Sequence, residues 1–313
     1  MSAFDPLRTL ASSVMLGRMR VLTIVSCWIV SVSLLSSAAT ADVVGPRNNV
    51  IQRICPTDTT LANLVAKSDL IVVATPDVPV RLVQSAMRKE SPEYIDVPLS
   101  GASILKGGDI GSSLTLKVYP KKTTYAPSPK ALVQQTRKPT LLFLTRVDQG
   151  PVGIYLTHSL DAVQDASATR VEAVRVELRR QEALSGPPTA EVSLPHYNYV
   201  RDLLSVLPQA TPERQEEIFR KLEAFGVEGV PAIVAQMDDR RPLVVRRIAL
   251  ANHDPDAFEG LRHYGPELVV DALDAILNQI TGFGGFVVNG GSERERQAAV
   301  AAWRVYAADL RCH

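Results

Sequence analysis

The sequence of 313 residues holds 34 Lys and Arg against 33 Asp and Glu, which gives a formal net charge of +1. This balance excludes a strongly basic nucleic-acid-binding protein. Three cysteines are too few for a fold built on disulfides, and the length suits one large domain or two small ones.

Residues 1–41 have the three-part pattern of a secretory signal peptide. Three arginines flank an apolar run over residues 21–35, and small residues follow up to Ala39-Thr40-Ala41. An uncleaved anchor is the alternative, because the run approaches the ~20 apolar residues that span a bilayer. Serines dilute the apolar character of the run, so we expect cleavage after Ala41. The mature chain would then be secreted or periplasmic, and it would not be an integral membrane protein.

The mature chain is expected to belong to a bacterial envelope. Removal of residues 1–41 takes away three arginines and one aspartate and leaves a formal net charge of −1. The sequence contains no Asn-x-Ser/Thr glycosylation acceptor, which favours a bacterial exported protein over a eukaryotic one.

Composition and periodicity both change at Gly186-Pro187-Pro188. Eight of the nine lysines precede this break in the mature chain, and only Lys221 follows it. We therefore predict an α+β protein with a β-rich domain over residues 42–186 and an α-helical domain over residues 187–313.

The first half shows short strand patterns with a helix pattern at each end. The expected helices lie near residues 61–65 and over 166–184, where Val171, Val174 and Leu178 share one face. The expected strands cover residues 70–74, 78–82, 114–118, 140–145 and 152–156. Such an arrangement implies a small barrel or sandwich with flanking helices.

Four segments of this half carry a family resemblance: Ser68-Asp-Leu-Ile-Val-Val, Ile104-Leu-Lys-Gly107, Leu141-Leu-Phe-Leu144 and Gly153-Ile-Tyr-Leu156. Their order resembles secreted OB-like barrels of the netrin and metalloproteinase-inhibitor type over residues 60–160. The resemblance implies a barrel. The chain lacks the N-terminal cysteine that these inhibitors use on their target, so inhibition is not implied.

The second half is expected to be helical throughout. Thr211 is a predicted N-cap with Pro212 at the first helical position, and the helix from Glu213 is expected to end at Gly226. Ser292 to Glu295 has the capping-box pattern and predicts the start of the last helix. A strong amphipathic pattern covers residues 266–281.

One stretch of this half resembles a single HEAT-type helical repeat. It comprises Leu222-Glu-Ala-Phe-Gly226, Val230-Pro-Ala-Ile-Val234, Asp239 and Val245-Arg-Arg-Ile-Ala249. The resemblance implies stacked helix pairs, whose concave face usually binds an extended partner.

Two segments are candidates for ligand binding. The glycine-rich loop over residues 282–291 has glycines suited to close approach and a helix N-terminus beyond it. Because it follows a helix and lacks a Gly-Lys-Ser/Thr ending, it matches no nucleotide-binding fingerprint. The alternative is a structural crossover in which Phe283 and Phe286 dock on the helices. The candidate ligand residues here are Gly284, Gly285, Gly290 and Gly291.

The second candidate lies between Asp109 and Asp148, a stretch without acidic residues. Prolines predict an extended loop that could meet phosphate or carboxylate groups. Solvated loop charges are the alternative. The candidate ligand residues in this stretch are Lys121, Lys122, Lys130, Arg137 and Lys138.

We expect no metal, cofactor or catalytic motif. The acidic and histidine residues nearest to a cluster are His253, Asp254, Glu259 and His263, which are more dispersed than zinc ligands usually are. The sequence has no Gly-x-Ser-x-Gly elbow and no credible cysteine–histidine dyad.

We therefore expect an exported envelope interaction protein that binds a protein or an anionic envelope component. One alternative is a hydrolase or lyase with a site between the domains, built for example from His253 and Glu259. Another is a carrier of an anionic ligand or glycan, which would need an apolar or basic cavity in the barrel. Cys55 and Cys312 are predicted to form a disulfide, because export places both thiols in an oxidising compartment. Two unrelated cysteines are the alternative.

Overall fold

The computed structural model describes residues 55–79, 94–108, 114–119, 129–148, 153–157, 159–186, 194–251, 260–284 and 286–312. They all fall within one compact unit, Gln52–His313. The predicted signal peptide lies outside the described residues. So does most of the strand predicted over residues 78–82, and residues 77–79 are not in a strand.

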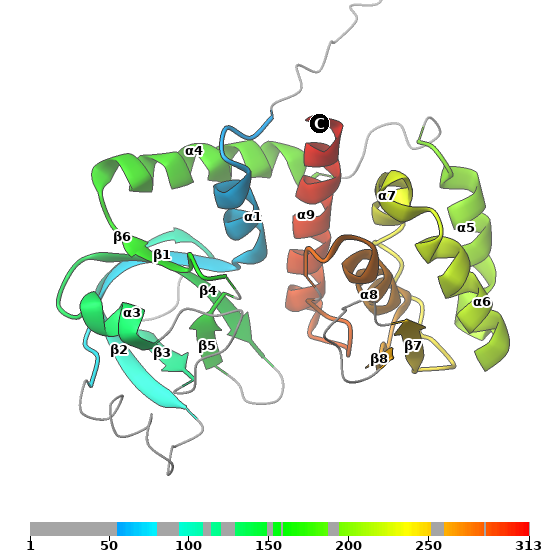
Figure 1. Ribbon diagram of the computed structural model, residues 1–313, viewed down its shortest axis with the longest axis horizontal. Coiled ribbons are helices and arrows are strands. Elements are labelled where there is room, and N and C mark those ends of the chain that lie inside the picture. Colours follow the sequence, from blue (N-terminus) through cyan, green and yellow to red (C-terminus); the bar gives the residue numbers. More distant parts are fainter. Residues whose placement is uncertain are drawn as a thin grey trace, which may run out of the picture. The chain divides into compact units, whose positions relative to one another are not determined.

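Five strands close into a barrel (Figure 1). They are β1 (Leu70–Pro76), β2 (Ile95–Lys106), β3 (Leu114–Val118), β4 (Thr140–Val147) and β5 (Gly153–Leu156). The order is β1-β2-β3-β5-β4, and β1 also pairs with β4, which closes the ring. The β3–β5 pair is parallel and the other pairs are antiparallel. A short strand, β6 (Val163–Asp165), extends the sheet beside β4. The structure thus confirms a β-barrel and the α+β class.

Burial patterns explain the strands. Ile95, Val97 and Leu99 alternate with exposed residues in β2, as expected for a strand with one face in the core. The first five residues of β4 are all buried, because other elements cover both of its faces. The short helix α3 (Pro129–Gln134) precedes β4. An extended loop was predicted there, so that part of the prediction is wrong.

Two helices accompany the barrel, as the sequence predicted. Helix α1 (Thr59–Lys67) begins after Asp58, whose carboxylate accepts a hydrogen bond from the N–H of Leu61 at 3.0 Å. Helix α4 (Ala168–Leu184) buries Val174 and lies against α1 and α9. Figure 1 shows α4 extending across one end of the barrel.

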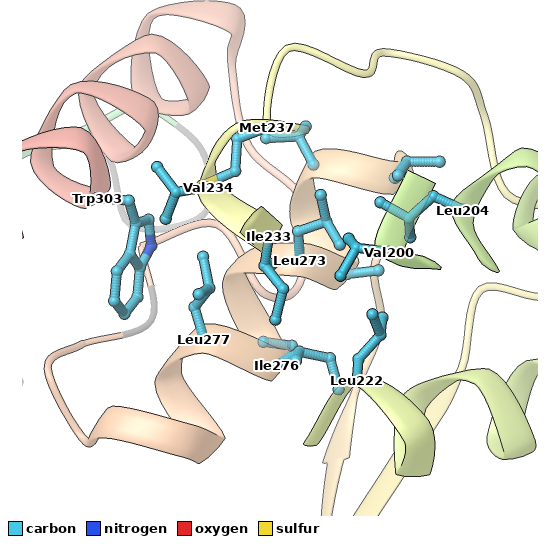
Figure 2. Close-up of a cluster of buried hydrophobic side chains, with 14 of the residues drawn as sticks. Val200, Leu204, Leu222, Ile233, Val234, Met237, Leu273, Ile276, Leu277 and Trp303 are labelled. Carbon is cyan, nitrogen blue, oxygen red and sulfur yellow. The ribbon is translucent and has the colours of Figure 1, made fainter. Parts of the chain in front are cut away.

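Five helices and two short 3₁₀ turns are described after residue 194. The helices are α5 (Tyr197–Val206), α6 (Pro212–Glu223), α7 (Gly226–Val234), α8 (Val269–Thr281) and α9 (Glu293–Asp309), and the turns are η2 (Leu207–Gln209) and η3 (Leu310–Cys312). The Thr211 cap and the Ser292–Glu295 capping box are present as predicted. Figure 2 shows the shared core, where Leu204, Leu222, Ile233, Leu273, Ile276 and Trp303 are buried.

The prediction that this half is helical throughout is wrong at one place. Strands β7 (Ile248–Ala251) and β8 (Leu261–Tyr264) form an antiparallel hairpin. Ile248 and Leu250 are buried while Ala251 is exposed. This is a period of two, as in a strand, whereas the sequence analysis predicts a helix here.

The two ends of the described chain meet. Cys55 and Cys312 form a disulfide with their Cα atoms 5.7 Å apart and a sequence separation of 257. Helix α9 packs against both α1 and α4. The domain boundary near residue 186 stays a prediction, because residues 187–193 lie outside the described part of the chain.

Candidate ligand-binding cavity

A cavity of about 1000 Å³ lies at one end of the barrel, beside helices α1, α4 and α9. We call it the barrel-end cavity. Strand ends supply Leu70, Lys106, Tyr119 and Leu156 to its lining. Lys67 and Ser68 at the end of α1, Phe283 and Phe286 of the α8–α9 loop, and one face of α9 also line the cavity.

Small side chains on α9 leave room for the cavity. Ala298, Ala301, Ala302 and Val305 all line it, and their spacing of three and four residues places them on one face of the helix. Trp303 is on another face and is fully buried in the helical core. The same helix therefore supplies a core aromatic on one side and a cavity wall on the other.

The glycine-rich loop is held in place as a structural crossover. Phe283 is nearly fully buried, and its ring centroid lies 5.1 Å from that of Trp303. Phe286 also contacts Trp303, with ring centroids 6.2 Å apart. Gly282 ends α8 in the left-handed conformation. This packing is the alternative that the sequence left open for the loop.

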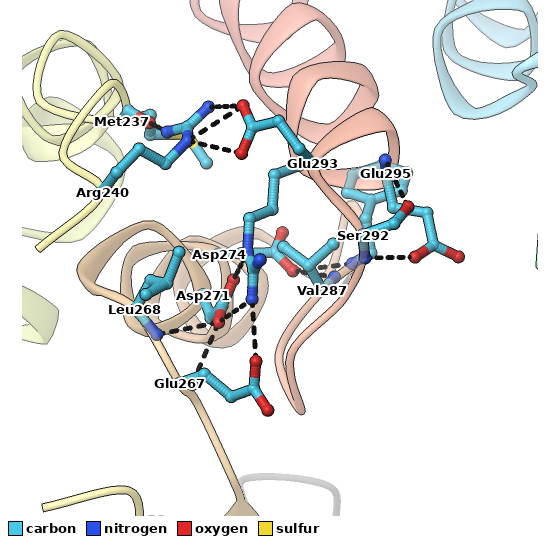
Figure 3. Close-up of polar contacts among 12 residues, drawn as sticks. Met237, Arg240, Glu267, Leu268, Asp271, Asp274, Val287, Ser292, Glu293 and Glu295 are labelled. Carbon is cyan, nitrogen blue, oxygen red and sulfur yellow. Dashed lines mark hydrogen bonds and ion pairs between the residues drawn. The ribbon is translucent and has the colours of Figure 1, made fainter. Parts of the chain in front are cut away.

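Asp274, a residue of α8, holds the glycine-rich loop through hydrogen bonds to its backbone. Its Oδ2 accepts hydrogen bonds from the N–H groups of Phe286 and Val287, both at 2.7 Å (Figure 3). Its Oδ1 accepts one from Trp303 Nε1 at 2.7 Å. Burial raises the pKa of Asp274 to about 7, although these donors act in the opposite direction.

The candidate glycines lie at different places in this loop. Gly284 and Gly290 line the barrel-end cavity. Gly291 is buried, and a Cβ there would contact Val287 and Glu295. Gly285 lies outside the described residues.

Two lysines bring positive charge to the cavity. Lys106 Nζ donates a hydrogen bond to the carbonyl oxygen of Val65 at 2.8 Å. Lys67 Nζ lies 4.7 Å from the ring centroid of Phe283. Burial lowers the pKa of Lys106 to about 8, opposed by the charge of Asp69, and burial also lowers the pKa of Lys67. Both ammonium groups are near the negative, C-terminal end of the α1 dipole.

Gly107 determines where Lys106 sits. Its φ is +104°, and a Cβ at this position would lie 2.6 Å from the carbonyl oxygen of Asp69. Only glycine permits both the conformation and this close approach of the end of β2 to the start of β1.

Hydroxyl groups of two buried residues and one half-buried residue form a chain in the cavity wall. Ser68 Oγ lies 2.9 Å from Thr157 Oγ1, which lies 3.2 Å from Thr145 Oγ1. Ser68 also donates to the carbonyl oxygen of Leu64 at 2.8 Å and so satisfies one free carbonyl at the end of α1.

Arg294 joins α9 to the barrel at the cavity rim. Its Nη1 lies 2.8 Å from Asp69 Oδ2, and its Nε lies 2.7 Å from Asp148 Oδ2. Its Nη2 donates to the carbonyl oxygen of Arg146 at 2.8 Å, while Arg146 N–H donates to Asp69 Oδ1 at 2.8 Å. We call this group of four residues the Arg294 clamp.

Among its described residues, the predicted basic stretch lines the cavity near its two ends. Lys117 and Arg146 line the cavity, whereas the candidates Arg137 and Lys138 are exposed just after α3 and do not line it. Lys121 and Lys122 lie outside the described residues, and so does the side chain of Lys130.

None of the residues suggested for a catalytic site is found in the described lining of the cavity. His263 is in β8, paired with Ala249, and does not line it. His253, Asp254 and Glu259 lie outside the described residues. Among the residues that the structure describes, no group of three or more His, Cys, Asp or Glu is placed to hold a metal ion.

The sequence alone did not identify Lys67, Lys106, Asp69 and Arg294 as candidate site residues. Each is an ordinary surface type in its own segment, and only the fold brings them together. Within the described ranges, no helix has the length and apolar character needed to cross a membrane. Comparisons with known protein families, with curated proteins and with solved structures find no match.

Proposed function

We propose that the mature chain is an exported binding protein whose barrel-end cavity holds a small molecule with an apolar body and an anionic group. The observation that supports this proposal is the pair of desolvated lysines in a large, mainly apolar cavity. Such a site is what the carrier interpretation of the sequence required.

The apolar lining would receive the body of the ligand. Leu70, Leu156, Phe283 and the alanines of α9 offer carbon surface, and the volume of about 1000 Å³ is at the upper end for small-molecule pockets. Burial of a ligand against this surface would be favoured by the hydrophobic effect at about 25 cal/mol per Å² of apolar area.

The lysines would receive the anionic group. In the described part of the chain, neither Lys67 nor Lys106 forms an ion pair with a carboxylate. Burial penalises their charged forms, so a bound anion would offset that penalty through charge-assisted hydrogen bonds. Binding of an anion would also raise their pKa values and take up protons.

Two of the three acidic groups in the described lining, Asp69 and Glu295, favour binding over hydrolysis. Asp69 is held by Arg294, and Glu295 accepts a hydrogen bond from the N–H of Ser292 at 2.7 Å in the cap of α9. These carboxylates are occupied in holding the structure together, which leaves them poorly placed for acid–base work on a substrate.

The barrel is proposed to be OB-like, as the resemblance of residues 60–160 suggests. The strand order β1-β2-β3-β5-β4 with β1–β4 closure supports this assignment, as does the helix α3 ahead of β4. A HEAT-type array is not favoured, because the β7–β8 hairpin stands where the second helix pair would begin.

Binding can be tested with 8-anilinonaphthalene-1-sulfonate, which has an aromatic body and one sulfonate. Trp303 is the one tryptophan left after removal of residues 1–41, and it contacts both phenylalanines of the cavity wall. We expect saturable dye fluorescence together with a change in Trp303 emission. Lys67→Met and Lys106→Met should each weaken binding roughly tenfold, because each removes a charge-assisted contact.

Two controls make the test specific. Lys221→Met removes an exposed lysine that pairs with Glu217 at 2.7 Å and should leave binding unchanged. Ala301→Phe places a ring in the cavity and should abolish binding, whereas Gln297→Phe on the exposed side of α9 should not. Equal binding by wild type, both lysine variants and Ala301→Phe would refute the proposed site.

A further inference from the structure

Lys106 differs from the other described lysines in how its amine is held. Its Nζ has a single polar partner in the described residues, the carbonyl oxygen of Val65 at 2.8 Å. Gly107 fixes the strand end that carries it against β1. The amine is therefore positioned, lines the cavity, and keeps two N–H bonds free of that contact.

Other lysines lack this combination. Lys117 pairs with Asp96 at 3.3 Å and Lys221 with Glu217 at 2.7 Å, so each of these amines has a carboxylate partner. The Nζ of Lys67 lies 4.7 Å from the ring centroid of Phe283, in a cation–π contact.

Charged groups from every neighbouring element face the same cavity. The acids are Asp69, Glu182 and Glu295, and the bases besides Lys106 are Lys67, Lys117, Arg146 and Arg294. Arg294 pairs with Asp69 at 2.8 Å. Burial lowers the pKa of Lys106 to about 8, although the charge of Asp69 acts in the opposite direction. A substantial fraction of this amine is therefore neutral near pH 7.5, unlike an exposed lysine.

We propose that Lys106 is a covalent site for aliphatic aldehydes that enter the barrel-end cavity, where its amine forms an imine. The neutral amine attacks the carbonyl carbon and forms the C–N bond of a carbinolamine. The C–O bond then breaks, and the oxygen leaves as water with the two amine hydrogens. The product is the imine between the aldehyde carbon and Nζ, and no redox partner is needed.

The apolar lining supports an aliphatic chain on the aldehyde. Leu70, Leu105 and Phe283 line the same cavity as Lys106. This inference depends on the cavity and on Lys106, and it does not depend on the anionic group in the proposed function.

The test uses octanal with sodium cyanoborohydride, which reduces the imine to a stable secondary amine, followed by peptide mass spectrometry. At pH 7.5 we expect Lys106 to be modified roughly tenfold or more faster than Lys221. In wild-type protein the rate at Lys106 should rise with pH up to about 8 and then level. Ala301→Phe should slow it by closing the cavity, and Gln297→Phe should not.

Lys106→Arg separates the two proposals. The arginine keeps the positive charge and a donor for Val65 but has no nucleophilic amine, so it should retain the sulfonate dye and lose octanal modification at position 106. If the wild-type protein does not bind the dye but Lys106 is labelled by octanal as expected, only the proposed anionic ligand is rejected. Labelling of Lys106 at the rate of Lys221, or a rate that keeps rising to pH 10, would overturn the covalent site.

Discussion

The guanidinium of Arg294 in α9 lies 2.8 Å from the carboxylate of Asp69 at the start of β1, across 225 positions of sequence. It also binds Asp148 and the backbone carbonyl of Arg146 at the end of β4. One side chain thus holds the last helix against two strands of the barrel and forms part of the cavity rim.

We predict that Arg294→Ala destabilises the protein by about 2–3 kcal/mol, because it removes the guanidinium that pairs with two carboxylates, Asp69 and Asp148. Urea unfolding followed by circular dichroism measures the loss. Arg179→Ala is a matched control, since Arg179 makes an exposed ion pair with Glu172 at 3.2 Å and its loss should change the stability much less. Similar losses in both variants would mean that the clamp contributes no more than a surface pair.

The disulfide between Cys55 and Cys312 should stabilise the unit that it closes. Its loop spans 257 positions, and loops of this size are worth about 4–5 kcal/mol in the chain-entropy model, with measured gains often smaller. We expect the double variant Cys55→Ala/Cys312→Ala to unfold at lower urea concentration by an amount equivalent to about 2–5 kcal/mol. Thiol titration of denatured, unreduced wild type should find no reactive cysteine in the mature chain. Two free thiols would contradict the bond.

Because the pKa of Asp274 is raised in the folded protein, we expect the free energy of unfolding to depend on pH. Its pKa in the folded protein is raised from 3.8 to about 7, so the unfolded chain releases this proton first as pH rises. The free energy of unfolding should therefore fall between about pH 4 and pH 7 and lose this dependence above it.

The measurement compares urea midpoints from pH 4 to pH 8 in wild type and in Asp274→Asn. The variant cannot accept all three N–H donors with one oxygen, so it should be less stable at low pH. The difference between the two proteins should narrow as pH rises towards 7. A difference that is constant with pH would show that Asp274 keeps an ordinary pKa in the folded state.

Local signals in the sequence predicted much of the fold. The Thr211 cap and the capping box at Ser292 are short-range hydrogen-bond patterns, and both are present. The buried strand runs over β1 and β4 were recognised from consecutive apolar residues. The pairing of Cys55 with Cys312 was predictable because these are the two cysteines that would remain if residues 1–41 are removed as predicted.

Other features depend on tertiary context that a single segment does not display. The sequence predicted a helix at β7, because two buried residues, Ile248 and Leu250, are not enough to define a period of two. The charge-rich stretch drew attention to Arg137 and Lys138, yet these are exposed. Lys67 and Lys106 lie 39 positions apart and become part of one site only because β2 returns to the end of α1.

Gly107 offers a last test, because its neighbour Gly108 provides a matched control. Both have positive φ, +104° and +68° respectively, so alanine is strained at either position. A Cβ at Gly107 would lie 2.6 Å from the carbonyl oxygen of Asp69, whereas a Cβ at Gly108 would meet nothing within 4 Å. We expect Gly108→Ala to cost about 1 kcal/mol and Gly107→Ala about 2–4 kcal/mol, the excess arising from the backbone contact.

The displaced strand end in Gly107→Ala should also move Lys106 away from the carbonyl of Val65. Octanal labelling at Lys106 should then slow in Gly107→Ala and stay unchanged in Gly108→Ala, under conditions where both variants are folded by circular dichroism. Equal stability losses with unchanged labelling in the two variants would show that the close approach at Gly107 does not set the position of the amine.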